Sequence, residues 1–382
     1  MQKVDTLIFI IVAILMLIGA VFSYSLPVFL EMKKHLSEYH FFGRYLIFAA
    51  LGFAWMYFLS RLDPEKWFNI IGFAILMTSG ILVIILPFLP ESIAPVINGA
   101  KRWIKIGFLK FSPVEFFKIG VVFFLAWSFT RKINKIKTSK TLKDDFLTLF
   151  PYLVLFGMFW TFISLLLSDL GQVVVMLLLF IILLIGAGGR GKTLGLIGLL
   201  GIVIAVIAIM SKPYRLARIE NWLYTMSSNF FQKPIVEGSI ANYGQVIQSM
   251  NAIHHGGIFG KGIGNGVFKL GYLSDVHTDF VLAGIAEEAG LIGITIIFGL
   301  FAVLLYRIFK ISNRSEKKEY QLFALGIGAL IGIQFLLNGL GITSLFPLKG
   351  LTVPFLSYGG SSLMAFATAI GMVLMISKKA KI

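Results

Sequence analysis

The chain has 382 residues, of which 58% are hydrophobic and only 14% are charged, whereas soluble domains carry about 25% charged residues. Its net charge of +16 would suit a nucleic-acid-binding protein, but its Lys and Arg residues stand in short stretches between apolar runs, which argues against that class. The absence of cysteine excludes disulfides, thiolate metal sites and cysteine nucleophiles. We therefore expect an all-α integral membrane protein.

Ten apolar runs are long enough to cross a hydrocarbon core of about 30 Å, which requires about 20 helical residues. The first run has no small-residue cleavage site and is longer than the core of a signal peptide, so we expect it to be retained. Residues 1–382 then form a single polytopic membrane domain. The predicted transmembrane helices span approximately residues 6–28, 42–60, 67–89, 112–129, 146–167, 170–187, 193–210, 279–306, 320–340 and 361–377.

The distribution of Lys and Arg predicts the orientation, because basic residues in short loops are retained on the cytoplasmic side. Segments 131–143 and 307–318 are strongly basic, and placing them inside makes both termini cytoplasmic. The extracytoplasmic loops then lie at about 90–111, 211–278 and 341–360, with the largest between the seventh and eighth helices.

Several basic residues stand on the outer side in this topology. Long loops translocate regardless of charge, which accounts for the second outer loop but not for the short first one. An anionic ligand on the outer face would account for both. The residues concerned are Lys101, Arg102, Lys105, Lys110, Lys212, Arg215, Arg218, Lys233, Lys261 and Lys269.

Glu115 and Lys118 stand three residues apart on one face of the fourth predicted helix. Ionisable groups at membrane depth are costly and by default indicate function, but a self-neutralising structural ion pair is an equally good interpretation. Asp169 follows Ser168 directly before the sixth predicted helix, in a sequence typical of a helix N-cap.

Asp279 stands where the long outer loop enters the eighth predicted helix, at the depth of a lipid headgroup. Taken alone, it is better interpreted as a carboxylate favoured by the helix dipole in a first turn. Glu287 and Glu288 lie two turns deeper on the same helix. We expect them to close its cytoplasmic half or to meet a Lys or Arg of a neighbour, outside the chemistry.

Two glycine-rich segments require an interpretation. Residues 186–193 match the phosphate-loop pattern, but they join two predicted membrane helices without a nucleotide-binding fold, so we interpret them as a basic cytoplasmic turn. Residues 256–266 either approach phosphates through backbone N–H groups or form a compact loop with positive φ angles. The nearby histidines, His254, His255 and His277, show no spacing typical of a metal site.

Taken together, these motifs resemble the SEDS family (shape, elongation, division and sporulation), and the match covers nearly the whole chain. Pro113-Val114-Glu115 departs from the family's usual Pro-Ser-Glu or Pro-Ala-Glu, and Ser168-Asp169 from its Pro-Asp, but both keep the charged group. The second departure leaves only the local helix break in doubt. The motifs lie at 98–104, 111–118, 212–218, 248–249 with 256–266, 277–280 with 287–288, and 354–362.

The resemblance implies a peptidoglycan glycosyltransferase that polymerises lipid II, the undecaprenyl-pyrophosphate-linked disaccharide-peptide, into glycan strands on the outer face of the bacterial cytoplasmic membrane. Residues 349–352 resemble the division member of the family more than the elongation member, which implies synthesis at the division septum. The implied partners are a cognate class B penicillin-binding protein, which is a transpeptidase, and other divisome proteins.

The resemblance also implies roles for single residues. Asp279 matches the family's catalytic aspartate and would act as the general base. Basic groups would stabilise the departing pyrophosphate, a role that a divalent cation such as Mg or Mn could share; the metal stays unknown, and the reaction needs no nucleotide. The implied substrate-binding residues are Arg102, Trp103, Glu115, Lys118, Arg215 and His277.

Two other functions remain open at this point. A flippase or other transporter of lipid-linked sugars would also have about ten helices and intramembrane charges, but carriers usually contain two repeats, and the 98–118 pattern has no second copy. A non-catalytic scaffold for a transpeptidase would account for the membrane helices. It would not account for the outward acidic and basic residues.

Overall fold

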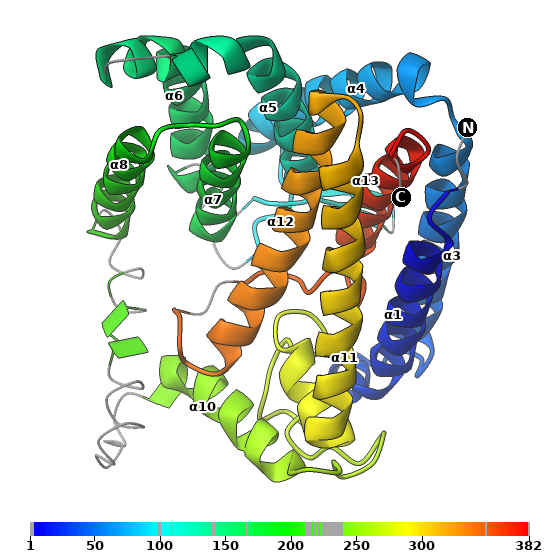
Figure 1. The fold of residues 1–382 in the computed structure, drawn as a ribbon. Coiled ribbons are helices and arrows are strands. Elements are labelled where there is room, and N and C mark those ends of the chain that lie inside the picture. The colour runs from blue at the N-terminus through cyan, green and yellow to red at the C-terminus, as the bar shows by residue number, and fades with distance from the viewer. Residues whose placement is uncertain are drawn as a thin grey trace.

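The computed structural model describes residues 4–97, 101–107, 109–138, 142–165, 167, 169–210, 216, 219–220, 222–223, 240–347 and 350–380. It is built almost entirely from α-helices (Figure 1). Each of the ten predicted transmembrane runs coincides with one long helix. These helices are α1 (Thr6–Ser25), α3 (His40–Arg61), α4 (Pro64–Ile85), α5 (Pro113–Thr138), α6 (Leu142–Leu165), α7 (Leu170–Gly186), α8 (Gly191–Met210), α11 (Val281–Arg314), α12 (Lys318–Ile342) and α13 (Gly360–Ser377).

Seven helices of the described part are long and apolar enough to cross a membrane. Shorter apolar stretches lie at Leu147–Trp160, Gly171–Gly186 and Gly191–Ile207, within α6, α7 and α8. The structure therefore confirms a mostly helical protein with helices that are long and apolar enough to span a membrane. The count of ten crossings and the cytoplasmic location of both termini stay predictions.

Several helix starts follow from local capping. Asp5 accepts hydrogen bonds from the backbone N–H groups of Leu7 and Ile8 at the start of α1. Asp63 caps α4, which has proline at its first position. Asp169 accepts a hydrogen bond from Gln172 N (3.4 Å) and caps α7, as the sequence predicted. An acidic side chain at these positions satisfies backbone donors that have no partner within the helix.

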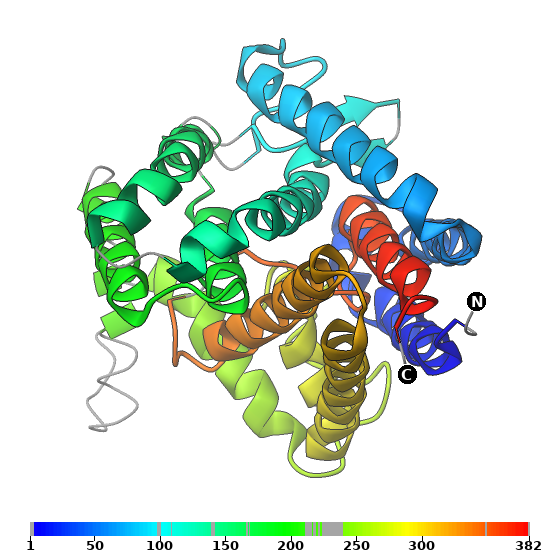
Figure 2. The same cartoon turned by 45° about the horizontal axis from the view of Figure 1, so that its top comes forward.

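The buried centre of the bundle is formed by α5, α12 and α13, which are the most buried of the long helices. Figures 1 and 2 show α13, in red, beside α3, and small residues let these two helices approach closely. A side chain at Gly52 or Gly371 would collide with α13 or α3, respectively. Small residues at such interfaces are typical of helix packing in membranes, where tight van der Waals contact drives association.

The two ends of the described chain lie at the same end of the bundle. Arg307 pairs with Asp5 (2.7 Å), and Ser315 forms a β-bridge with Ala380. The helix α10 (Ile240–Gly256) lies at the opposite end (Figure 1). The two ends of the described chain and the described part of the second predicted outer loop, residues 240–278, therefore lie at opposite ends of the bundle. Which side of the membrane each end faces stays a prediction.

The predicted outer loops contain regular structure that the sequence did not indicate. An antiparallel hairpin of β1 (Ile104–Ile106) and β2 (Leu109–Phe111) lies in the first loop, and α10 lies in the second. Two further short helices, α2 (Val28–Lys33) and η1 (Leu86–Phe88), follow α1 and α4. The phosphate-loop-like segment 186–193 joins α7 to α8, where Arg190 pairs with Asp145 (3.9 Å) of α6, so it is a turn between helices.

The predicted helix at 279–306 corresponds to α11, but α11 is broken at Gly290 (φ 67°, ψ −168°), which the sequence did not indicate. The N–H groups of Leu291 and Ile292, which the break deprives of helical partners, donate to the carbonyls of Gly257 and Ile258 (3.0 and 3.2 Å). Thus the chain before the helix closes the new N-terminus that the break creates.

The same segment closes the other side of the break. The carbonyls of Glu287 and Glu288 accept hydrogen bonds from the N–H groups of Lys261 and Gly262 (3.0 Å each). A Cβ atom at Gly260 would collide with the Glu288 carbonyl, so the pairing requires glycine there. Segment 257–262 is therefore an integral part of the fold, because its backbone pairs with the helix on both sides of the break.

We predict that Gly260→Ala lowers the thermal stability of the purified protein more than Gly257→Ala does. Both glycines have positive φ (79° and 61°), where an alanine costs about 1–2 kcal/mol. Only at Gly260 does the added Cβ meet backbone; at Gly257 nothing lies within 4 Å. Equal melting temperatures for the two variants would contradict the close approach described above.

Candidate active site

Asp279 lies just before α11 and is held by its backbone. Its N–H donates to the Asp275 carbonyl (3.1 Å), and its own carbonyl accepts a hydrogen bond from Asn338 Nδ2 (2.7 Å). The helix begins at Val281 with Phe280 at the N-cap, so Asp279 lies outside the first turn. This geometry removes the basis for interpreting Asp279 as a first-turn acid.

On one side, the Asp279 carboxylate faces the backbone of Gly350, which has no side chain. A Cβ atom at Gly350 would be 2.9 Å from Asp279 Oδ2, so the glycine leaves room for the carboxylate. Asn338 also donates to the Leu351 carbonyl (2.8 Å). Leu351 follows Gly350, so Asn338 links this segment to the Asp279 backbone. The segment between α12 and α13 therefore borders the candidate base.

This segment also holds the residues before Asp279. Ser357 Oγ accepts a hydrogen bond from Val353 N (2.8 Å) and donates to the Thr278 carbonyl (2.6 Å). Tyr358 N donates to the His277 carbonyl (2.9 Å). These contacts fix the backbone of 277–279 before α11 begins.

The end of the same segment holds the start of α5. Ser361 Oγ donates to the Lys110 carbonyl (3.0 Å) and accepts from Ser112 N (3.0 Å). Ser362 forms a further hydrogen bond with Thr352 (2.8 Å). A single segment, 350–362, thus brings the turn that bears Asp279 and the junction of β2 with α5 to one end of the bundle.

Glu115 and Lys118 form an ion pair in α5 (2.9 Å), and the Lys118 side chain is fully buried. Glu115 also accepts a hydrogen bond from Gln172 Nε2 of α7 (3.2 Å). The pair joins α5 to α7. The ion pair itself is therefore present, whereas a role of Glu115 and Lys118 in substrate binding stays a prediction.

Arg102 lies beside the cap of α7. Its Nε is 3.6 Å from Asp169 Oδ2 and 3.5 Å from the Leu167 carbonyl, and about a third of its side chain (32%) is exposed. Trp103 follows directly before β1 and is half-buried. Arg102 is therefore a predicted substrate-binding residue whose positive charge is accessible to a ligand without a rearrangement of the core.

His277 is buried against aromatic rings and is not a cation. Its ring lies 5.2 Å from that of Phe41 and 5.9 Å from that of Tyr358. Burial lowers the pKa of His277 to about 4, so the imidazole is neutral at pH 7. It cannot supply positive charge to a phosphate, and any contact with substrate would be through hydrogen bonding or packing.

The sequence reasoning missed Arg44 of α3. This residue hydrogen bonds to Tyr358 and partly offsets the burial that raises the pKa of the Tyr358 hydroxyl. Arg44 therefore adds a positive charge beside Tyr358, whose ring lies 5.9 Å from that of His277. The signal was available, because Arg44 stands at the outer end of the second apolar run, but it fell within the predicted helix and was not counted with the loop residues.

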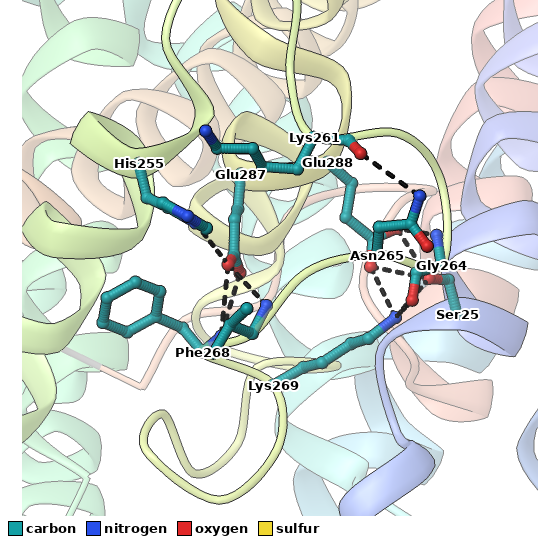
Figure 3. A network of polar contacts seen from close by, with 10 residues as sticks. Ser25, His255, Lys261, Gly264, Asn265, Phe268, Lys269, Glu287 and Glu288 are labelled. Carbon is teal, nitrogen blue, oxygen red and sulfur yellow. Dashed lines mark hydrogen bonds and ion pairs between the residues drawn. The ribbon is translucent and has the colours of Figure 1, made fainter.

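Glu287 and Glu288 do not close the cytoplasmic half of α11. Figure 3 shows them at the break, surrounded by the glycine-rich segment. Glu288 binds Lys269 Nζ (2.7 Å), Gly264 N (3.0 Å) and Ser25 Oγ of α1 (2.6 Å), so the expected basic partner is present. The other carboxylate, that of Glu287, accepts from the N–H groups of Val267 (2.6 Å) and Phe268 (3.2 Å) and contacts His255 Nδ1 (3.1 Å).

The contacts of Glu287 and Glu288 favour the compact-loop interpretation of residues 256–266, since backbone N–H groups of this region already bind the protein's own carboxylates. Several predicted positions lie outside the described residues, namely Arg215, Ser168, Lys349 and residues 98–100. Within the described ranges, no three His, Asp or Glu residues are grouped so as to hold a metal ion.

Comparisons with known proteins agree in family and fold. The model of the cell cycle protein family of FtsW, RodA and SpoVE matches residues 5–382. The chain is 41% identical to a probable peptidoglycan glycosyltransferase FtsW of Helicobacter pylori, with 99% of each chain covered. It is 34% identical to the Geobacter sulfurreducens protein of the same description, covering 100% of this chain and 96% of the relative.

Solved structures show the same fold. A chain of a peptidoglycan synthase complex, described as coordinating polymerization and crosslinking, superimposes with a TM-score of 0.73 at 24% identity, covering 100% of this chain and 99% of that one. The rod shape determining protein RodA of Thermus thermophilus superimposes with a TM-score of 0.65 at 23% identity, covering 99% and 98%. The helical arrangement is therefore that of these two proteins.

Proposed function

Because the chain belongs to the cell cycle protein family of FtsW, RodA and SpoVE, we infer that it is a peptidoglycan glycosyltransferase that acts in cell division. The observation that carries this inference is the 41% identity over 99% of both chains to a relative of that description. The inferred substrate is lipid II, and the product is a glycan strand. The fold supports this function, because one segment binds backbone both beside Asp279 and at the junction of β2 with α5.

In the proposed reaction Asp279 is the general base. It removes the proton from the 4-hydroxyl of the acceptor disaccharide as that oxygen attacks the anomeric carbon of the growing chain. The bond from this carbon to the undecaprenyl pyrophosphate breaks, and the pyrophosphate leaves with the bonding electrons. One base suffices for inversion without a covalent sugar intermediate, by analogy with inverting glycosidases.

Positive charge for the pyrophosphate comes in this proposal from Arg102, with Arg215 and Lys118 as further members. Arg102 is the partly exposed one, whereas Lys118 is neutralised by Glu115 and acts from a buried position. The hairpin adds a second argument, because Lys105 and Lys110 stand directly opposite each other. Like charges in such a pair repel, and a bound anion would relieve the repulsion.

We place the enzyme in the cytoplasmic membrane at the division septum, with the end that bears Asp279 outside. A class B penicillin-binding protein is its proposed partner. The likeness to a chain of a complex that couples polymerization to crosslinking supports a transpeptidase partner. Other divisome proteins would bring the pair to the septum.

The function is tested with purified protein, its transpeptidase partner and lipid II. We expect glycan strands longer than the starting disaccharide, together with release of undecaprenyl pyrophosphate. A transporter would instead move lipid II across a liposome bilayer and leave it unchanged. Translocation without any glycan product would therefore contradict the proposal.

A further inference from the structure

The glycine-rich segment has an apolar outer side. Ile258, Phe259 and Ile263 are 60%, 82% and 61% exposed in the chain on its own. Contiguous exposed apolar residues on a soluble surface are uncommon and mark an interaction site. The backbone of this segment contacts the glutamates: the N–H group of Gly264 donates to the Glu288 carboxylate (3.0 Å; Figure 3).

This apolar side is continuous with the exposed face of α11. The carbonyl of Ile258 is bonded to Ile292 N, so the tip of the segment lies against the start of the long half of the helix. There, Leu291, Ile292 and Ile296 are also exposed. α11 is one of the helices long and apolar enough to cross the membrane, and such exposed apolar faces contact lipid.

Contacts at the two ends of α1 give the depth of the segment. At one end Asp5 pairs with Arg307 (2.7 Å), and at the other Ser25 binds Glu288 (2.6 Å). The 20 residues of α1 rise by about 30 Å at 1.5 Å per residue, which equals the thickness of a hydrocarbon core. With the N-terminus on the inner side, as the distribution of Lys and Arg predicts, Asp5 and Arg307 mark the inner boundary and Glu288 lies at the outer boundary.

The short helix α2 marks the same level. Its Phe29 side chain lies against Gly271, which follows the glycine-rich segment in the chain, and Met32 is exposed. Lys33 and Lys34 follow at once. Exposed apolar residues followed by lysines are typical of a segment that lies in the membrane interface.

We propose that residues 257–263 are embedded in the outer leaflet, with Ile258, Phe259 and Ile263 in contact with lipid acyl chains. The segment then has two functional sides: the apolar side anchors it in lipid, and the backbone side closes the break in α11. The Glu287 and Glu288 carboxylates, with Lys269, are sealed from water beneath it. The lipid anchor is independent of the proposed enzymatic function.

The absence of cysteine allows a direct test with single spin labels on the full chain in phospholipid nanodiscs. Labels at Phe259→Cys and Ile263→Cys are expected to collide more often with oxygen, which concentrates in lipid, than with a water-soluble nickel complex. Ile296→Cys on α11 is the lipid-exposed control. Ser274→Cys, exposed in the chain before Asp279, is the water-exposed control, with the opposite ratio.

Collision ratios at 259 and 263 equal to that at 274 would overturn the proposal, because the segment would then project into water. Labels shielded from both reagents would also overturn it, in favour of a protein that covers this surface. Labelling at two positions keeps the test valid if one variant fails to fold. The label ratios do not depend on glycan synthesis, so failure here leaves the proposed function standing.

Discussion

Asp279→Asn is expected to abolish glycan-strand synthesis while the protein still folds, inserts and binds its partner. Asparagine keeps the shape and one oxygen but does not accept the proton, and loss of a general base costs about 10²- to 10⁴-fold in rate. The hydrogen bonds that Asp279 forms with Asp275 and Asn338 through its backbone do not involve its carboxylate, so the substitution leaves them in place. The measurement is the initial rate of glycan formation from lipid II, with thermal stability recorded alongside.

Asp275→Asn is the matched control for this variant. Asp275 is exposed, four residues before Asp279, and has a positive φ of 55°, which asparagine tolerates as well as aspartate does. We expect near-normal rates from it. Near-normal synthesis by Asp279→Asn would refute the base, and equal losses in both variants would mean that the local backbone, rather than one carboxylate, carries the effect.

Among the proposed variants, Lys118→Met is expected to lose the most thermal stability, and also to lose glycan-strand synthesis. Methionine keeps the length of the side chain but leaves Glu115 buried without its partner, which typically costs about 3–5 kcal/mol. The control is Lys317→Met, which breaks an exposed pair with Glu65 (3.5 Å, both side chains 52% exposed). Exposed pairs contribute about 0–1 kcal/mol, so this variant should melt like the wild type.

The double variant Glu115→Gln with Lys118→Met separates the two interpretations of the pair. It removes both charges together, so most of the lost stability should return. If Lys118 contributes to pyrophosphate binding, as proposed, the double variant still fails to polymerise lipid II although its stability is restored. Full activity in the stable double variant would restrict the pair to a structural role.

Local patterns were sufficient to predict the helices. Long apolar runs coincide with the ten long helices, and the Asp169 cap of α7 appears where the sequence placed it. These features depend on composition and on neighbours within one turn. By contrast, nothing within a turn of Gly290 reveals the break in α11, because the partners of the freed N–H groups lie at 257 and 258, more than 30 residues away.

The assembly of the candidate site was equally hidden from local patterns. Ser361 binds backbone at Lys110 and Ser112, and Ser357 binds Thr278. Motif order indicated that these segments belong to one family, but periodicity gave no reason to place 361 beside 112, which are 249 residues apart. Likewise, the sequence shows that Glu288 is charged and needs a basic partner, but it does not indicate that this partner is Lys269.

The account depends most on Asp279 facing the outer side of the membrane, since lipid II is polymerised there in the proposed function. Single cysteines at Ser274, five residues before Asp279, and at Lys317, between α11 and α12, test this in intact cells, because both positions are exposed and the chain has no other cysteine. We predict that a membrane-impermeant maleimide labels Ser274→Cys and leaves Lys317→Cys unlabelled until the cells are opened. The reverse pattern would place Asp279 in the cytoplasm and contradict the proposed site.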